Sequence, residues 1–205
     1  MGAQRETMSQ LKYRRDVWAL GPNQTGYPGG FPNGFIEQLK KNGWWGEKRL
    51  WVFSGGFKDR EGTTVDIKPE CNPSVVADAT ALPFDDESFD FVCLDPPYSE
   101  KESQELYGLP MPSITAFLNE MARVLKPGGT AVLLSRIVPN CYPQQNEHWR
   151  RLYWKGIIGV FTIAGIANMR ALCVWGKEQT LKTNPRCEPP RAGATAEPEK
   201  QQTDV

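Results

Sequence analysis

Short apolar runs, each ending abruptly in polar, glycine or proline residues, recur along this 205-residue chain. The runs have the length and the apolar or β-branched content of buried strands, whereas some of the longer segments between them have helical spacing. Strands that alternate with helices are typical of a mostly parallel sheet in an α/β domain. We therefore predict strands at residues 50–53, 63–67, 74–77, 91–94 and 130–135.

Two segments have the periodicity of amphipathic helices. In residues 34–41 the apolar positions share one helix face, and Asn42-Gly43 is a suitable stop. In residues 114–125 the apolar side chains form a broad core face, with Ser113 as the N-cap and Lys-Pro-Gly-Gly at 126–129 as the stop. The intervening segment 99–112 is mainly polar, and we predict a loop there.

The two ends of the chain differ from its middle. Residues 147–154 predict a short basic, aromatic-rich helix, and residues 156–162 and 168–176 predict two strands joined by a short turn. Residues 1–12 are mostly polar, and from residue 178 the chain is rich in Pro, Glu, Lys, Thr and Gln. We expect a flexible N-terminus over 1–12, one domain over 13–177 and a disordered tail over 178–205.

Composition narrows the class of protein. Lys plus Arg and Asp plus Glu are both 24, so there is no overall basic field of the kind that drives non-specific nucleic-acid binding. The five cysteines form no CxxC pair and there is one histidine, so we expect no metal site. The first residues lack a secretory pattern and the longest apolar run is too short to span a bilayer, which predicts a cytoplasmic protein without a membrane partner.

Four of the predicted strands end in glycine or in an acidic residue. Gly55-Gly56 follows the first strand, and Asp66, Asp78 and Asp95 follow the next three. The carboxyl ends of parallel strands meet at one edge of a sheet, so we expect these residues to converge on one cleft. Glycines there let the backbone approach a ligand closely, and an acid after the second strand can accept hydrogen bonds from ribose hydroxyls.

Several of these motifs resemble those of class I S-adenosylmethionine-dependent methyltransferases. The pattern Asp-Ala-x-x-Leu-Pro-Phe at 78–84 is similar to their third cofactor segment, and 123–129 is similar to their helix-to-strand junction. Asp-Pro-Pro-Tyr at 95–98 resembles the signature of amino-methyltransferases that act on adenine N6 or cytosine N4 in DNA. The resemblance covers residues 26–177 and departs from the family at the first strand, where Phe53-Ser54 stand in place of the usual acid.

The resemblance implies a fold, a cofactor and a set of site residues. The implied fold is a Rossmann-like α/β domain with a mostly parallel sheet and a closing antiparallel hairpin. The implied cofactor is S-adenosyl-L-methionine. The residues expected to bind it are Phe53, Ser54, Gly55, Gly56, Asp66, Ile67, Asp78 and Ala79.

The catalytic residues implied are Asp95, Pro96, Pro97 and Tyr98. An aromatic amine is a poor nucleophile, so the site must align its nitrogen with the methyl group and favour a pyramidal geometry. The Asp95 carboxylate can accept one N–H and the Pro96 carbonyl the other, while the carboxylate offsets positive charge developing on the nitrogen. Tyr98 would stack on the ring that carries the amine. No strong base is required.

A base in duplex DNA would have to be flipped out of the stack to reach this loop. The Tyr27–Pro32 loop and the following helix resemble the cofactor-flanking motif of DNA amino-methyltransferases. The 99–112 loop and the 148–155 segment would then contact the base. For the 148–155 segment, a slightly favoured interpretation is that its aromatic side chains pack on the sheet instead. The small size of the domain also allows a partner subunit for target recognition.

Two other interpretations remain open from the sequence. Related Pro-Pro loops serve methyltransferases that act on RNA or on a protein glutamine amide, but the glutamine pattern favours Asn in the first position, so Asp95 favours a nucleobase. Alternatively, the chain is a catalytically degenerate subunit that retains the fold, which is consistent with the atypical first motif.

Overall fold

The computed structural model describes residues 13–23, 31–139, 146–162 and 169–179. The expectations for the flexible N-terminus, for most of the Tyr27–Pro32 loop and for the tail beyond residue 179 therefore lie outside the described residues. Glu178 and Gln179 are described, and their carbonyl groups accept hydrogen bonds from Arg151.

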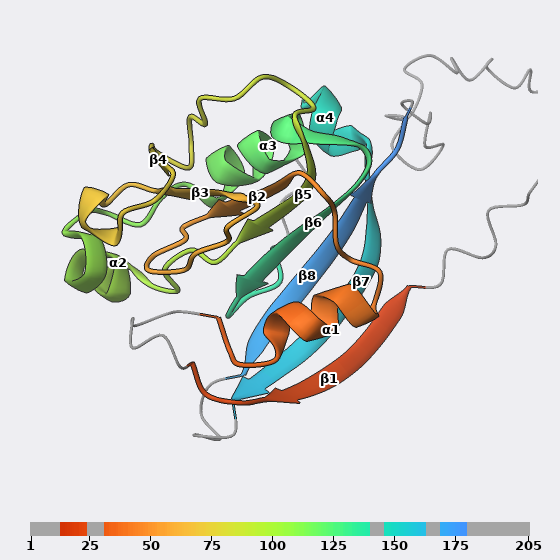
Figure 1. Cartoon of the computed structure of the whole chain (residues 1–205), viewed down its shortest axis with the longest axis horizontal. Coiled ribbons are helices and arrows are strands. Elements are labelled where there is room, and N and C mark those ends of the chain that lie inside the picture. The colour runs from red at the N-terminus through yellow and green to blue at the C-terminus, as the bar shows by residue number, and fades with distance from the viewer. Residues whose placement is uncertain (1–12, 24–30, 140–145, 163–168, 180–205) are drawn as a thin grey trace, which may run out of the picture.

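A single twisted sheet of eight strands runs through the molecule in the order β1-β7-β8-β6-β5-β2-β3-β4 (Figure 1). All neighbouring strands are parallel except those that contact β8, which is antiparallel to both β6 and β7. The expected Rossmann-like α/β fold with a closing antiparallel pair is confirmed. The strands are β1 Arg14–Leu20, β2 Arg49–Val52, β3 Thr63–Asp66, β4 Val75–Val76, β5 Phe89–Leu94, β6 Leu125–Ser135, β7 Leu152–Thr162 and β8 Arg170–Lys177.

Helices cover both faces of the sheet. Helix α1 (Phe35–Lys41) packs on one face and helix α3 (Ile114–Val124) packs on the other (Figure 1). Helix α2 (Glu100–Tyr107) lies at the carboxyl ends of β2 and β5. Helix α4 (Glu147–Arg150) adjoins α3. A short 3₁₀ helix, Pro69–Cys71, follows β3. Each face has its own apolar core, because successive side chains on a strand point to opposite faces.

Alternate side chains along a strand belong to different cores, as expected for a strand with both faces buried. Leu50 and Val52 pack with α3, whereas Trp51 between them packs with α1. Cys93 and Cys173 are fully buried in opposite cores, as expected for cysteines within apolar runs. Helix α1 ends at Asn42-Gly43 as predicted, and Ser113 caps α3 by accepting a hydrogen bond from the Ala116 amide.

Three sequence-based expectations about elements are wrong. The segment 99–112 contains the helix α2, because Ser99 caps it and Gly108 ends it in a left-handed conformation. The helix expected over 147–154 ends at Arg150, and the residues from Leu152 belong to β7, where they pair with β8. Strand β6 begins at Leu125 immediately after α3, so the Lys-Pro-Gly-Gly segment lies within the strand rather than before it.

Strand β1 has no counterpart among the predicted elements. It adds to the edge of the sheet in parallel with β7, and Trp18 and Leu20 enter the core beneath α1. Its outer side is exposed, and the Asp16 carboxylate accepts a hydrogen bond from the neighbouring Val17 amide. A side chain that satisfies an edge amide reduces the tendency of the strand to pair with another chain.

Candidate active site at the carboxyl ends of the parallel strands

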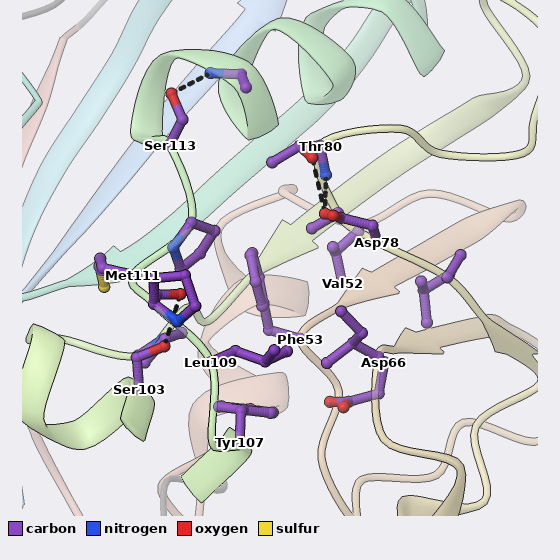
Figure 2. Close-up of a pocket in the computed structure, with 18 residues that line it drawn as sticks. Val52, Phe53, Asp66, Asp78, Thr80, Ser103, Tyr107, Leu109, Met111 and Ser113 are labelled. Atoms are coloured by element: carbon purple, nitrogen blue, oxygen red, sulfur yellow. Dashed lines mark hydrogen bonds between the residues drawn. The ribbon is translucent and has the colours of Figure 1, made fainter. Parts of the chain in front are cut away.

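A cavity of ≈ 340 Å³ opens at the carboxyl ends of β2, β3 and β4. Figure 2 shows Phe53 and Asp66 on one side of it and Tyr107, Leu109 and Met111 opposite. Its volume is in the range of small-molecule sites, and its lining is mostly apolar with a few polar groups. The residues that line it are Val52, Phe53, Val65, Asp66, Ile67, Ala77, Asp78, Ala79, Thr80, Pro97, Ser103, Tyr107, Leu109, Pro110, Met111, Pro112, Ser113 and Ala116.

Asp66 organises the glycine turn that follows β2. Its side chain is buried, and its two carboxylate oxygens accept hydrogen bonds from the amides of Gly55, at 2.8 Å, and Lys68, at 2.9 Å. Gly55 has φ of 50°, in the left-handed region that glycine tolerates best. A carboxylate offers about four lone-pair positions, so two remain for a ligand in the cavity.

Asp78 is held in a local turn next to Ala79. One of its oxygens accepts hydrogen bonds from both the amide and the hydroxyl of Thr80, each at 2.8 Å (Figure 2). The second carboxylate oxygen has no described protein partner, and the side chain is exposed toward the cavity mouth. Of the three strand-end acids expected to converge on one cleft, Asp66 and Asp78 line this cavity and Asp95 does not.

Phe53 and Ser54 occupy the position of the missing acid after β2. Phe53 has φ of 57°, which is unfavourable for a residue with a bulky side chain, and its ring contacts Phe117 edge-on at 5.4 Å between centroids. The Ser54 hydroxyl is buried without a hydrogen-bond partner among the described residues. Of the eight expected cofactor residues, five line the cavity: Phe53, Asp66, Ile67, Asp78 and Ala79. Ser54, Gly55 and Gly56 are not among its lining residues.

Helix α2 and the residues after it form the wall that the sequence reasoning missed. The Ser103 hydroxyl donates to the Pro110 carbonyl at 3.2 Å, and Glu100 accepts from the Met111 amide at 2.9 Å. Lys68, just after β3, donates to the Leu106 carbonyl. Together these contacts connect the far wall of the cavity to β3. A sequence signal for this helix existed, because Ser99 and Glu102 have the spacing of a capping box.

The Asp-Pro-Pro-Tyr loop separates this cavity from a smaller one of ≈ 40 Å³. Pro97 lines the larger cavity, whereas Pro96 and Tyr98 line the smaller one, and Met111 borders both. The loop is buried up to Pro97 and begins where the Asp95 amide donates to the Val52 carbonyl at 3.4 Å. The smaller cavity is completed by Ile114, Phe117, Leu133, Ser135, Arg136, Ile137 and Pro139.

Asp95 lines neither cavity and is only 9% exposed. Burial raises the pKa of its carboxyl to about 7, against the opposing effects of the Arg170 charge and of the hydrogen bond that the Tyr98 hydroxyl donates to it. The Tyr98 hydroxyl also accepts a hydrogen bond from Arg170 at 3.0 Å. Burial and the adjacent Asp95 raise the pKa of Tyr98, so this hydroxyl stays protonated.

Two arginines lie beside the Tyr98 ring. The guanidinium groups of Arg136 and Arg170 lie 5.3 and 6.0 Å from the centre of its ring. Both arginines follow or begin strands in the last third of the fold, and sequence reasoning assigned neither a role. Their sequence positions carry no motif, so only the sheet topology brings them to this loop.

The 148–155 segment lies away from both cavities. Trp149 is buried in the core and Trp154 packs on Trp175 at 4.8 Å between ring centroids. Arg151 pairs with Glu87 at 2.6 Å, and Lys155 donates to the Thr130 hydroxyl at 2.9 Å. These side chains are used within the fold, which agrees with the favoured interpretation of packing on the sheet rather than with base contact.

Comparisons with known proteins agree with this architecture. A model of the methyltransferase domain family matches residues 59–133, from the loop after β2 to near the end of β6. A demethylmenaquinone methyltransferase of Staphylococcus carnosus is 38% identical over 88 residues, which are 42% of this chain and 31% of the relative. The chain thus matches less than a third of the length of that relative.

Solved structures with a similar arrangement of elements include two archaeal proteins. One is a Haloferax volcanii protein described as the methyltransferase in complex with the Trm112 activator. It is 15% identical, with a TM-score of 0.47, and the match covers 71% of this chain and 94% of that one. The other is a methyltransferase of Methanosarcina mazei, with 16% identity, a TM-score of 0.44 and coverage of 68% and 97%. Likenesses at these scores carry no inference about substrates or partners.

The strand order and the antiparallel β8 give this domain a Rossmann-like fold of the methyltransferase class, and residues 59–133 match the methyltransferase domain family. S-adenosylmethionine is the cofactor that this class implies, and the lining residues fit its nucleoside end. Asp66 and Asp78 keep oxygens available at adjacent strand ends, and the apolar side chains between them can enclose a purine ring. The unpartnered Ser54 hydroxyl provides one polar group beside the glycine turn.

Two structural findings complete the description of the site. In the part of the chain that the structure describes, no helix is both long and apolar enough to cross a membrane. Among the same residues, no group of three or more His, Cys, Asp or Glu side chains is arranged to hold a metal ion.

Proposed function

We propose that this chain transfers a methyl group from S-adenosylmethionine to an exocyclic amine. The observation that carries the proposal is the position of the Asp-Pro-Pro-Tyr loop, which stands between a cofactor-sized cavity and a second, smaller cavity. A buried carboxylate at the start of this loop, at the carboxyl end of β5, matches the location at which ligands meet in open α/β sheets.

The bound cofactor supplies a methyl group activated by a sulfonium centre. In the proposed reaction the amine nitrogen forms a bond to the methyl carbon while the carbon–sulfur bond breaks, which leaves a neutral thioether and a positively charged nitrogen. That nitrogen then loses one proton to water or to Asp95. The ionised Asp95 would accept one N–H and the Pro96 carbonyl the other, which orients the lone pair and offsets the developing charge.

The roles proposed for the cofactor residues follow from their positions. Asp66 would accept hydrogen bonds from ribose hydroxyls, and Asp78 with Ala79 would contact the adenine ring, with Phe53 and Ile67 on its faces. Gly55 and Gly56 shape the turn behind them, and Ser54 is the nearest polar group for the methionine end.

We favour a nucleobase as the acceptor, and the preferred acceptor atoms are adenine N6 and cytosine N4 of DNA. Asp rather than Asn begins the loop, and the smaller cavity is flanked by the exposed Arg136, whose guanidinium could contact a phosphate. In the described residues no carboxylate lies within ion-pair distance of Arg136. RNA remains the next nucleic-acid acceptor to test, and a protein glutamine follows it. A separate target-recognition subunit is also part of this proposal.

A small-molecule acceptor is the second candidate function. It is favoured by the match to the S. carnosus demethylmenaquinone methyltransferase, which is confined to a part of that enzyme. The product distinguishes the two candidates: a quinone acceptor would leave nucleic acid and protein unlabelled.

The decisive experiment offers tritiated-methyl S-adenosylmethionine with plasmid DNA, total RNA, cell protein and a lipid quinone extract in parallel. We expect label in DNA, recovered as N6-methyladenine or N4-methylcytosine after nucleoside analysis. Asp95→Ala should reduce transfer by at least about a hundredfold, because it removes both the acceptor of the N–H and the compensating charge. Cofactor binding by isothermal titration should remain, because Asp95 does not line the larger cavity.

Other outcomes of this experiment would contradict the proposal in different ways. Full activity in the Asp95→Ala variant would place the acceptor elsewhere. Label only in the quinone extract would support the second candidate. No binding of S-adenosylmethionine at millimolar concentration would instead indicate a degenerate subunit that has kept the fold.

A further inference from the structure

Arg170 connects the closing strand of the sheet to the Asp-Pro-Pro-Tyr loop. It is the first residue of β8, its side chain is buried to 9% exposure, and its Nη1 donates to the Tyr98 hydroxyl at 3.0 Å. The Tyr98 hydroxyl in turn donates to Oδ1 of Asp95. The three side chains therefore form a chain of hydrogen bonds from β8 to the end of β5.

The charges around this chain are unequal. Asp95 is faced by Arg170 from β8, by Tyr98 from its own loop, by Glu102 from α2 and by the buried Cys93 thiol from β5. Arg136, after β6, lies over the Tyr98 ring. No carboxylate of the described chain is within 4.0 Å of Arg170, so the negative group that it reaches is Asp95, through one intervening hydroxyl.

A buried guanidinium is costly unless its charge is compensated, and a buried carboxylate is costly for the same reason. The bridge through Tyr98 lets each group compensate the other without direct contact. A direct Arg–Asp pair would occupy the carboxylate with two N–H donors, whereas the bridge occupies one oxygen and leaves the other for an acceptor amine.

We propose that Arg170 is a positioning residue of the acceptor site, and that Tyr98 acts as the hydrogen-bonded bridge through which Arg170 orients and neutralises Asp95. This inference rests on the proposed function, because it assigns Asp95 to the amine. Two hydrogen bonds on one hydroxyl fix the orientation of the Tyr98 ring, and the guanidinium groups near that ring occupy space in which an acceptor ring would otherwise stack.

A purely structural role for Arg170 makes a different prediction. If Arg170 only packs against the loop, its replacement changes stability but leaves the titration of Asp95 where it was. If it balances the Asp95 charge, its replacement by a neutral side chain makes Asp95 harder to ionise. The titration of Asp95 therefore separates the two roles, and it can be measured without any acceptor substrate.

The test measures the pKa of Asp95 by ¹³C NMR, from the chemical shift of its side-chain carboxyl carbon as a function of pH. The full-length protein is labelled at aspartate, and the Asp95 resonance is assigned as the one that is lost in Asp95→Asn. In Arg170→Gln we expect the acid dissociation constant of Asp95 to fall about tenfold or more, which is a rise of about one pKa unit. Tyr98→Phe should also raise the pKa of Asp95, and Arg170→Lys should restore most of the wild-type value because it keeps the charge.

The matched control is Arg150→Gln, because Arg150 is an exposed arginine on α4, and it should leave the Asp95 titration unchanged. An Asp95 titration in folded Arg170→Gln that is the same as in the wild type would overturn the inference. If Arg170→Gln does not fold, Tyr98→Phe decides in its place: the inference requires a raised Asp95 pKa in that variant, and an unchanged value overturns it.

The kinetic consequence is measured with whichever amine acceptor the wild type methylates. Arg170→Gln should lower kcat by about tenfold to a hundredfold, leave the KM for S-adenosylmethionine within about twofold, and shift the acidic limb of the pH–rate profile upward by the amount that NMR reports. A wild type that methylates no amine refutes the proposed function, while the NMR titration still decides whether Arg170 and Asp95 are coupled.

Discussion

Burial determines the protonation of Asp95 more than any single neighbour does. Removal from water raises the pKa of this carboxyl to about 7, and the Arg170 charge and the Tyr98 hydroxyl only partly oppose that effect. In the native state the carboxyl is therefore protonated below about pH 7, whereas in the unfolded chain it ionises near pH 4. Above pH 7 the protein keeps a buried negative charge at a cost in stability, which is typical of a residue retained for chemistry.

Asp95→Asn should consequently stabilise the protein in a pH-dependent manner. Asn occupies the same volume and can still accept the Tyr98 hydroxyl hydrogen bond, but it never carries the charge. Above pH 7 we expect the variant to gain on the order of 2 to 4 kcal/mol in the free energy of unfolding, and this gain should shrink as pH falls from 7 toward 4.

Urea unfolding at pH 8.5, 6 and 4.5 measures that dependence, with methyl transfer assayed in parallel. The stabilised variant should have lost most of its activity, because neutral Asn cannot offset charge on the amine. A constant difference in unfolding free energy across these pH values would show that Asp95 titrates as an ordinary exposed carboxyl.

At the level of elements, one residue, Glu102, joins helix α2 to the Asp-Pro-Pro-Tyr loop. Glu102 accepts a hydrogen bond from the Tyr98 amide at 2.6 Å, and its own amide donates to the capping Ser99 hydroxyl at 3.1 Å. The same helix contributes Ser103 and Tyr107 to the cavity wall. The start of α2 therefore fixes both the loop that carries Tyr98 and one wall of the larger cavity.

Glu102→Ala should weaken cofactor binding although Glu102 does not line the cavity. Loss of this hydrogen bond, at about 1 kcal/mol, is expected to loosen the first turn of α2 and to raise the Kd for S-adenosylmethionine by roughly fivefold. Isothermal titration calorimetry measures the change. The control is Glu105→Ala on the same helix, an exposed residue whose contact with Lys101 is a surface ion pair at 3.7 Å. Equal Kd values in the two variants would contradict the expectation.

For the whole molecule, strand β1 extends the sheet at the edge opposite to the cofactor cavity. The order of strands places β1 at one end and β3 and β4, which border the cavity, at the other. Trp18 and Leu20 on β1 are 4% and 5% exposed and complete the core beneath α1. The core that β1 completes and the larger cavity thus lie toward opposite edges of the sheet.

Trp18→Ala should therefore destabilise the fold without changing the site. Removing a buried tryptophan leaves a cavity, at a cost of about 3 to 5 kcal/mol, seen as a lower urea midpoint. The Kd for S-adenosylmethionine should stay within about twofold under native conditions. Trp18→Phe should cost less, because it keeps an aromatic ring in the core. Val17→Ala on the exposed side of β1 should cost little. A large change in Kd with Trp18→Ala would show that β1 influences the site.

Three segments of the chain form elements that their local sequence patterns did not predict. Residues 99–112 contain too few apolar positions to give a helical period, so α2 was missed, although its Ser99 and Glu102 cap was present in the sequence. Residues 152–154 were expected to continue the basic, aromatic-rich helix that begins at residue 147, but pairing with β8 makes them a strand. Strand β1 was missed because its exposed residues interrupt the apolar pattern.

The sequence by itself determined the α/β class, most of the strands and the acids at their ends. These features depend on periodicity and on local breakers, which act between residues close in the chain. The positions expected to bind the cofactor include Asp66, Asp78 and their neighbours, and the structure gathers these around one cavity. Their chemical roles remain proposals.

Only the tertiary structure decided the surroundings of Asp95. Arg170 lies 72 residues from Tyr98, and it reaches the loop because β8 runs antiparallel beside β6 and begins near the carboxyl end of β5. The depth of Asp95, its raised pKa and the division of its loop between two cavities also depend on packing. A local pattern records which residue types follow one another, but burial and long-range charge arise only when distant segments meet.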